Sequence, residues 1–573
     1  MRTVTKSKGA FNIFCFLLIG LTFFFVQCKK PANSPQPPPP PPASLTFDVV
    51  TRSVNSISFN STQSLYGINN NPLIQIFFSD KIDKNSVSSA VAYYNKSQSS
   101  ATVSFNVSYQ NGDSSLLISP SAGISYLNEY IFSVSTLLKS ASGKTLAGRV
   151  DLDFFTSYDP SSKFPAISDD SLLTLVQKQT FKYFWEFGHP VSGLARDRNT
   201  GGDVVTSGGS GFGIMTIPVA VSRNFITRAQ GLARMQTIVS FLKNTAVNVK
   251  GAFPHFLNGA TGAIVPFSVN DNGADLVETS FLMMGLLTVR QYFNGADAAE
   301  TTLRNDINIL YNNVEWDWFR QNGQNVLYWH YSPDKGWIMN LPVKGWNECM
   351  ITYVLAASST THGIPATVYS SGWKGNGSNG FINGTSYNGI QLPLGPAYGG
   401  PLFFEHYSFL GIDPNGLSDA SASYATQTKN HTLINYNYCI RNPNGNYGYS
   451  DSCWGLTASD INGGYTASSP TNDVSVIAPT AAISSMPYTP VESMKALKFF
   501  YYVLGDKIWK EYGFTDAFSL KQLWYANSFL AIDQGPIIVM IENYRSGLIW
   551  NLFTSCPEVK NGMRSLGFTA PYL

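Results

Sequence analysis

Charge is scarce in this chain of 573 residues: only 13% of them are Asp, Glu, Lys or Arg, and the net charge is +2. Proteins that bind nucleic acid need a basic surface to neutralise phosphates, so we expect no nucleic-acid partner. Histidine is scarce too, with six in the chain and none before His189. No cysteine or histidine pair has the spacing of a zinc site. We therefore expect no zinc site, and we expect no cofactor either.

Cysteine is equally rare, and two of the six cysteines lie in the N-terminal leader. The other four are Cys349, Cys439, Cys453 and Cys556. Cys439 and Cys453 either form a disulfide in an oxidising compartment or remain free, buried thiols. The sequence leaves both alternatives open.

The leader itself has the layout of a secretory signal. Basic residues come first, and an apolar run follows over residues 11–26. Cys28 directly after this run resembles the lipidation site of a bacterial lipoprotein, with residues 1–28 as its signal peptide. The alternative is an uncleaved membrane anchor. Both place the rest of the chain outside the cytoplasm, and we expect a periplasmic or cell-surface protein anchored by lipid to the outer membrane.

Residues 29–44 contain an unbroken run of prolines from Pro37 to Pro42. Such a run excludes helices and central strands and adopts extended polyproline II. We interpret this segment as a stiff linker between the membrane and the folded part.

Two folded regions follow the linker. Residues 45–158 contain short β-branched and aromatic runs bounded by Asn, Asp, Ser and Gly, which predicts an all-β sandwich; the segment resembles a bacterial Ig-like domain. Residues 165–573 are mainly α-helical, and the helices expected there include residues 419–428 and 517–530. Helices that are apolar on every face alternate there with amphipathic ones, which predicts a toroid of buried inner and half-exposed outer helices.

Two carboxylates open one of the most apolar runs of the chain. Asp275 and Glu278 precede residues 280–289, and residues three apart share a side of a helix. Carboxylates at the mouth of a buried helix must be paired, hydrogen-bonded or exposed to a cavity. Acid/base hydrolysis uses carboxylates in a cavity; helix capping is the alternative role.

Residues 208–213, Gly-Gly-Ser-Gly-Phe-Gly, form a glycine-rich stretch. A dinucleotide site is disfavoured, because no strand clearly precedes the motif and no βαβ pattern surrounds it. We expect a tight loop that offers backbone N–H groups to a sugar or to a neighbouring side chain. Similar polar segments precede other apolar helices, and we expect them to gather at one end of the toroid.

The helical region resembles glycoside hydrolase family 144, the bacterial endo-β-1,2-glucanases with a "glucoamylase-like" domain. The resemblance implies an (α/α)6 barrel, no metal, and hydrolysis of β-1,2-glucan with inversion to sophorose or sophoro-oligosaccharides. It rests on segments that occur in order across about residues 170–570: 192–198, 206–213, 274–279, 327–332, 345–350, 403–408, 454–460, 477–482 and 532–538.

Inversion needs an acid and a base separated by roughly 6.5–9.5 Å, with a water molecule between base and sugar. Asp275 and Glu278 are too close in sequence to straddle a sugar, so one of them pairs with a distant carboxylate. We assign Glu278 as the acid and Asp460 as the base. Asp451 is a close rival for the base and Asp473 a weaker one, and an Asx-turn is the alternative role for Asp460.

The remaining candidates are assigned to substrate binding. Carboxylates and histidines would bond sugar hydroxyls, and aromatic rings would stack on glucose; core packing or a structural hydrogen bond is the alternative for each. These residues are Asp197, Asp275, Trp329, His330, Trp346, Glu348, Glu405, His406, Tyr407 and Trp454.

The sequence leaves other function classes open. A glycan-binding lipoprotein without catalysis, an exo-acting glucosidase and a polysaccharide lyase could use the same barrel, although acidic rather than cationic residues dominate the candidate loops. We expect a monomer acting on a β-glucan. The sequence does not fix endo or exo action.

Overall fold

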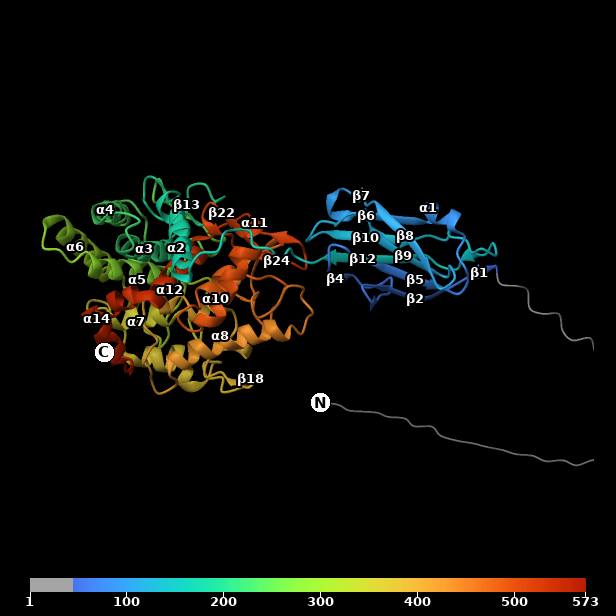
Figure 1. Ribbon diagram of the computed structural model, residues 1–573. Coiled ribbons are helices and arrows are strands. Elements are labelled where there is room, and N and C mark those ends of the chain that lie inside the picture. Colours follow the sequence, from blue (N-terminus) through green and yellow to red (C-terminus); the bar gives the residue numbers. More distant parts are fainter. Residues whose placement is uncertain (1–44) are drawn as a thin grey trace, which may run out of the picture.

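The computed structural model describes residues 45–573, and it places a β-sandwich and a helical domain end to end (Figure 1). The predicted signal peptide, the lipidation at Cys28 and the proline-rich linker lie outside the described residues. Within residues 45–573, helices long and apolar enough to span a bilayer are absent.

The sandwich consists of two five-stranded sheets. Its core lies between them and includes Ile76, Leu116, Phe132 and Phe154, each at most 1% exposed. The prediction of an all-β Ig-like sandwich is confirmed. In spatial order, one sheet is β4 (Leu65–Ile68), β12 (Val150–Thr156), β10 (Glu129–Val134), β6 (Val91–Asn95) and β7 (Ala101–Thr102), and the other is β3 (Ile57–Ser58), β2 (Val49–Val54), β5 (Ile74–Phe78), β9 (Ser115–Pro120) and β8 (Phe105–Gln110).

The helical domain alternates between inner and outer elements along the chain, which confirms the (α/α)6 toroid. Inner helices are almost wholly buried, and outer helices expose one face. The inner ring is α3 (Ser207–Ser222), α5 (Leu276–Tyr292), α7 (Met350–Ser358), the 3-10 turns Leu402–Glu405 and Ser408–Leu410, α9 (Pro479–Ile483) and α12 (Ala531–Ser546). Outside it lie α2 (Asp169–Trp185), α4 (Arg228–Asn244), α6 (Ala298–Asn312), the π-turn Val368–Trp373, α8 (Tyr424–Arg441) and α10 (Pro490–Lys498); α13 (Leu548–Thr554) and α14 (Pro557–Ser565) follow.

The inner helices α3 and α5 approach each other at glycines. A Cβ on Gly211 would lie 2.2 Å from the Phe281 carbonyl oxygen, and one on Gly285 would lie 2.2 Å from the Gly211 carbonyl oxygen. Glycine is a poor helix former, yet here its lack of a side chain lets two buried helices touch through their backbones. This explains why residues 208–213 belong to helix α3 and not to the loop that we expected.

Two other helix predictions also need correction. Residues 517–530 form a hairpin of β24 (Phe518–Ser519) and β25 (Trp524–Tyr525) instead of a helix. Residues 513–520 are buried without a break, and periodicity does not separate such a run from a buried helix. The helix expected at 419–428 begins only at Tyr424 and continues to Arg441.

All four cysteines of the described chain are free and buried. Cys439 and Cys453 lie in the same apolar core region without a disulfide between them. The free-thiol alternative is therefore the one that the structure shows.

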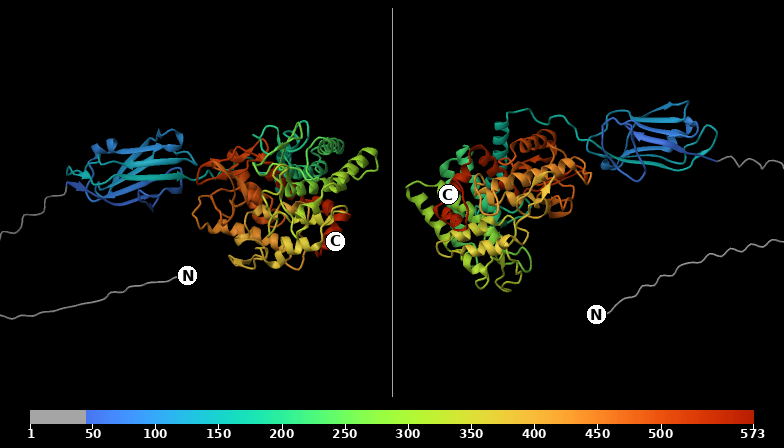
Figure 2. Two further views of the ribbon diagram at one scale, coloured as in Figure 1. Left: turned by 180° about the vertical axis from the view of Figure 1, so that it is seen from behind. Right: turned by 90° about the horizontal axis from the view of Figure 1, so that it is seen from below.

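Aromatic rings join the sandwich to the toroid, and both views of Figure 2 show the sandwich at one end of the helical domain. Tyr66 stacks on Phe155 at 4.6 Å within the sandwich and on Tyr447 of the toroid at 5.9 Å. The Tyr447 hydroxyl also accepts a hydrogen bond from the Tyr158 N–H. The contact holds the sandwich against the 442–453 loop.

Candidate active site

The N-termini of α3, α5 and α12 lie together at one end of the toroid, and for the segments before α3 and α5 this agrees with the prediction. A Cβ on Gly208 of α3 would lie 2.3 Å from the Glu278 Oε2 of α5, and one on Gly209 would lie 2.7 Å from the Ala531 Cβ of α12. This end of the ring therefore gathers acidic side chains from distant parts of the chain.

Asp275 is the N-cap of α5, and its Oδ1 accepts a hydrogen bond from the Glu278 N–H at 2.9 Å. Its Oδ2 lies 3.2 Å from His255 Nδ1 and 3.5 Å from His330 Nε2. Burial raises the pKa of this carboxyl, but the two histidines outweigh burial and hold its pKa well below the usual range. Asp275 is thus a fixed anion at the mouth of the helix.

Glu278 is 7% exposed, and its Oε2 accepts a hydrogen bond from the Gly208 N–H at 2.8 Å. Burial, together with the charges of Asp275 and Asp197, raises its pKa to about 7, against the opposing charge of His255 and the Gly208 bond. A group with this pKa holds a proton through part of the neutral range. That property suits a general acid.

His255 was not singled out from the sequence, where nothing in its surroundings marks it. It lies beside Asp275, and burial lowers its pKa, but the charges of Glu278 and Asp275 prevail and raise its pKa to about 9. His255 therefore carries a positive charge at neutral pH, in contact with Asp275 and within electrostatic reach of Glu278.

Asp271, Asp275 and His330 each present one ligand atom, and these atoms lie within 4.8 Å of one another. His330 Nε2 faces both carboxylates, at 3.3 Å from Asp271 and 3.5 Å from Asp275. Burial lowers the pKa of His330, but the two carboxylates outweigh it and raise the pKa. Because His330 already lies against both carboxylates, we interpret this group as a network of ionic and hydrogen-bonding contacts.

Asp460 lies in β20 (Ala458–Ile461), which pairs with β21 (Gly464–Ala467). Its Oδ2 accepts a hydrogen bond from Ser528 Oγ at 2.5 Å and lies 3.3 Å from Arg198 Nη1. The side chain is 14% exposed and lines a cavity of about 620 Å³ together with Arg198, Tyr465, Trp524 and Ser528. The carboxylate is held firmly and faces an open space.

Asp197 is a half-buried carboxyl, and Arg198 contacts it at 3.4 Å. Burial and the charge of Asp460 raise its pKa, while the charges of Arg198 and His255 oppose them, and Asp197 in turn raises the pKa of Glu278. Asp197 thus lies within electrostatic reach of both Glu278 and Asp460.

The two rival bases have other surroundings. Asp451 is 47% exposed and forms an ion pair with Lys495. Asp473 accepts hydrogen bonds from Tyr449, Asn446 and Tyr438 and from the Ser475 N–H. One is a surface ion pair and the other holds a loop together, which favours Asp460 over both as the residue that would activate water.

Glu348, Tyr407 and Trp329 lie near the acid. Burial raises the pKa of Glu348 to about 7, with contributions from the charges of Glu278 and Asp275. Tyr407 is buried, and its hydroxyl lies within electrostatic reach of Glu348 and Glu278. Trp329 is half-buried and stacks on His330 at 5.6 Å. Their substrate-binding roles stay predictions.

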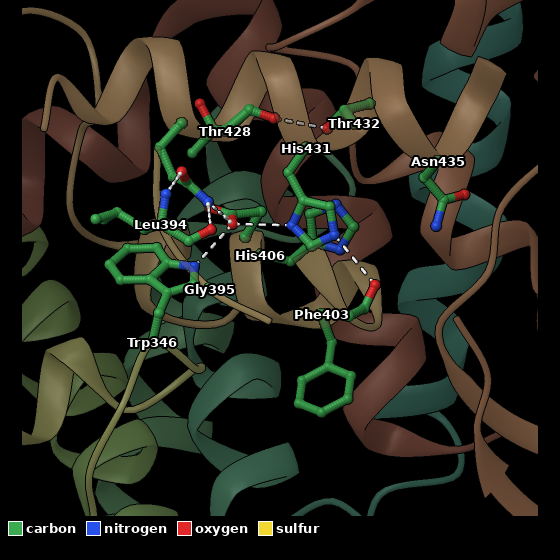
Figure 3. Close-up of polar contacts among 12 residues, drawn as sticks. Trp346, Leu394, Gly395, Phe403, His406, Thr428, His431, Thr432 and Asn435 are labelled. Atoms are coloured by element: carbon green, nitrogen blue, oxygen red, sulfur yellow. Dashed lines mark hydrogen bonds and ion pairs between the residues drawn. The ribbon is translucent and has the colours of Figure 1, made fainter. Parts of the chain in front are cut away.

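Glu405 and Trp346 belong to the core, and their assignment to substrate binding is wrong. Glu405 is 0% exposed, and its Oε1 accepts hydrogen bonds from Trp346 Nε1 at 3.0 Å, Gln427 Nε2 at 2.8 Å and His431 Nδ1 at 3.0 Å. Figure 3 shows Trp346 and His431 of α8 pointing toward this cluster from opposite sides. Trp346 packs against other rings, which leaves no face for a sugar.

His406 and Trp454 are also structural. His406 is 1% exposed and bonds Ser485 Oγ at 3.0 Å, and burial together with His431 lowers its pKa to about 3. Trp454 is 0% exposed and donates its Nε1–H to the Glu492 carbonyl at 3.3 Å. Neither reaches a surface on which a sugar could bind.

Two further carboxyls near the site, those of Asp516 and Asp533, are not among the residues predicted from the sequence. Asp533 stands in the first turn of α12, so it heads an apolar helix as Glu278 does, and that signal could have found it. Asp516 precedes β24 and carries no signal in the sequence. Both are 2% exposed.

Known proteins resemble both domains of this chain. Residues 340–557 match the family described as "Putative glucoamylase", and residues 51–156 match the bacterial Ig-like domain. An endo-β-1,2-glucanase structure from Chitinophaga pinensis has 51% sequence identity and a TM-score of 0.69, and the match covers 71% of this chain and 100% of that one.

Two relatives come from Parabacteroides distasonis. One, an exo β-1,2-glucooligosaccharide sophorohydrolase acting at the non-reducing end, is 45% identical over 70% of this chain, and the match spans 58% of that relative's length. The other, the structure of a β-1,2-glucanase, is 36% identical with a TM-score of 0.69 and covers 90% of this chain and 74% of that one. The chain belongs to glycoside hydrolase family 144, the family of glucoamylase-like β-1,2-glucanases, and carries an N-terminal bacterial Ig-like domain.

Proposed function

We propose that this chain hydrolyses β-1,2-glucan to sophorose or sophoro-oligosaccharides with inversion, using Glu278 as general acid and Asp460 as general base. Relatives named for this activity support the substrate. The observation that carries the assignment is Glu278, a buried carboxyl whose pKa of about 7 lets it hold a proton at neutral pH. It lies at the same end of the barrel as the cavity beside Asp460.

The reaction balances with these two groups. Glu278 gives its proton to the glycosidic oxygen as the bond to C1 breaks, and the leaving sugar departs with a new hydroxyl. Water attacks C1 from the opposite face, and Asp460 takes the proton that the water loses. The new reducing end has the α configuration, and a proton exchange with solvent restores both carboxyls.

The neighbouring groups set the charges. Arg198 and Ser528 hold the Asp460 carboxylate in place. Asp275 keeps a negative charge beside Glu278, which favours the protonated acid before the reaction. The positive charge of His255 opposes this and limits how tightly Glu278 holds its proton.

Asp460→Asn tests the base directly. The variant should lose hydrolysis by about 10²–10⁴-fold, because the amide does not take a proton from water. It should still bind the glucan, as measured by calorimetry with β-1,2-glucan. Turnover like that of the wild type would remove Asp460 from the mechanism, and the same assay on Asp451→Asn serves as the control.

Product analysis separates the modes of action and the other function classes. A ladder of oligomers early in the time course indicates endo cleavage, and sophorose alone indicates release from a chain end. Glucose alone would point to a glucosidase, absorbance from a new double bond to a lyase, and binding without any product to a glycan-binding protein.

The proposed location rests on the leader sequence. Cys28 would carry the lipid, and the protein would be held at the outer membrane in the periplasm or at the cell surface, as a monomer. Fractionation of cells that express Cys28→Ala tests this: the protein should move from the membrane to the soluble fraction. Retention of the variant in the membrane fraction would contradict lipidation and favour an uncleaved anchor.

A further inference from the structure

Behind Asp460 the structure places two carboxyls that face each other. Asp516 and Asp533 are each 2% exposed, and their side chains lie within hydrogen-bonding contact of one another. Asp516 precedes β24, and Asp533 belongs to the first turn of α12. Two buried carboxylates in contact would repel each other strongly.

Each carboxyl of the pair has one buried oxygen that no hydrogen-bond donor of the described chain reaches. Asp516 Oδ2 accepts a hydrogen bond from the Asp460 N–H at 2.6 Å. Within the described chain, Asp516 Oδ1 and Asp533 Oδ2 are buried and have no hydrogen-bond partner. Buried oxygens without a donor are costly, and a proton placed between the two carboxyls satisfies both of them.

The charges that face the pair point the same way. Burial raises the pKa of Asp516 to about 7, and burial with the charges of Asp516 and Asp460 raises that of Asp533 well above its usual value. The positive charge of Arg198 lowers the pKa of Asp516, but Arg198 also forms an ion pair with Asp460. The remaining titratable groups that face the pair are Asp197, Tyr183, Tyr407 and Tyr465.

We propose that Asp516 and Asp533 hold a proton between them in the resting protein and position Asp460 through its backbone N–H. The shared proton bonds Asp533 to Asp516, and Asp516 bonds the strand that carries Asp460. It also removes a negative charge from behind Asp460. The pair touches neither substrate nor water in this account, so both residues are positioning residues, and their link to turnover rests on the proposed role of Asp460.

Asp533→Asn is the informative change, because its amide N–H₂ donates to Asp516 Oδ1 where the proton stood. We expect turnover of β-1,2-glucan to stay within about threefold of the wild type, since the hydrogen bond is kept. Asp533→Ala removes the donor and leaves Asp516 alone, and we expect it to lose turnover by about 100-fold through displacement of Asp460. Rescue by asparagine and not by alanine is the expected pattern.

A second measurement needs no substrate. The folded chain holds a proton on the pair that the unfolded chain releases above about pH 4, so the pair makes stability fall as pH rises toward the folded pKa. Urea unfolding between about pH 5 and pH 8 gives the number of protons linked to folding. Asp533→Asn should show about one fewer proton than the wild type. Ser528→Ala, which loosens Asp460 without touching the pair, should keep the wild-type number.

These outcomes separate the pair from the proposed function. An unchanged proton number in Asp533→Asn, or turnover as low in Asp533→Asn as in Asp533→Ala, overturns the shared proton. Failure of the Asp460→Asn test overturns the base and leaves the proton number intact. Infrared difference spectra of the two proteins at the same near-neutral pH add a direct check, because the carbonyl band of the shared protonated carboxyl should be present in the wild type and lost in Asp533→Asn.

Discussion

Two acidic clusters of the toroid use the same residue types for opposite purposes. In the first cluster, Glu278 lies at the end of the ring beside Asp275, which His255 contacts. The Glu278 carboxyl accepts one hydrogen bond, from the Gly208 N–H. Around Glu405, a carboxyl accepts three side-chain hydrogen bonds and is wholly enclosed. All three bonds go to Oε1, while Oε2 is buried without a partner among the described residues. A carboxyl with few donors near an opening keeps its proton available, whereas one that joins three side chains from distant segments holds the fold together.

The largest expected effect comes from Glu278→Gln. The amide has no proton to give to the leaving oxygen, so turnover of β-1,2-glucan should fall by about 10²–10⁴-fold. The thermal midpoint should hold or rise, because the change removes a buried ionisable group. Glu405→Gln is the matched control, and it should keep most of the wild-type turnover. Equal losses of turnover in both variants would contradict the assignment of a catalytic role to Glu278 and a structural role to Glu405.

Gly208→Ala should lower turnover by displacing the Glu278 carboxyl, while Glu278 itself stays in the chain. The added Cβ would lie 2.3 Å from Glu278 Oε2 and must displace the carboxyl. A shift of about 1 Å costs about 100-fold in turnover. Steady-state kinetics measure the loss, and Gly148→Ala, where a Cβ meets nothing within 4 Å, is the control. Full activity in Gly208→Ala would show that the hydrogen bond to Glu278 is dispensable.

Glu405→Ala tests the structural cluster. It leaves His431, Trp346 and Gln427 without their common acceptor in a buried place, and each buried donor left unsatisfied costs about 1–3 kcal/mol. Urea unfolding measures this loss. The fraction that remains folded should keep its turnover. A loss of stability below about 1 kcal/mol would mean that the cluster contributes little to the fold.

His255→Gln should produce the smallest effect, a displaced pH profile. Glu278 acts as an acid only while protonated, so kcat/KM falls as pH rises through its pKa of about 7. His255 carries a positive charge that lowers this pKa. Without it Glu278 keeps its proton to higher pH, and the alkaline limb should move upward. A downward shift would contradict the charge assigned to His255, and His362→Gln at the surface should leave the limb in place.

The architecture was largely readable in the sequence because it depends on local pattern. Helices apolar on every face, such as α5 and α12, must be buried, and amphipathic α6 must lie outside. The sequence pattern did not predict the hairpin at 518–525, because a wholly buried run has no periodicity that distinguishes a strand from a helix. The helix over residues 208–213 escaped because its stability comes from contact with α5 and not from helix propensity.

The site was only partly readable because its members meet across long distances in the chain. Glu278 was marked by its place at the head of an apolar helix. Glu405 and His406 gave a similar polar signal, yet His431 and Ser485 enclose them from segments far away in sequence. His255 and Asp516 acquire their surroundings entirely from such tertiary contacts.

The most direct test of the account asks whether Glu278 delivers the proton. The dinitrophenolate group of an aryl sophoroside can leave without being protonated. Hydrolysis of this substrate therefore needs the base but not the acid. Glu278→Gln should hydrolyse this substrate within about tenfold of the wild type while losing β-1,2-glucan hydrolysis by about 10²–10⁴-fold, and Asp460→Asn should lose both. Equal losses on the two substrates in Glu278→Gln would contradict its role as the acid.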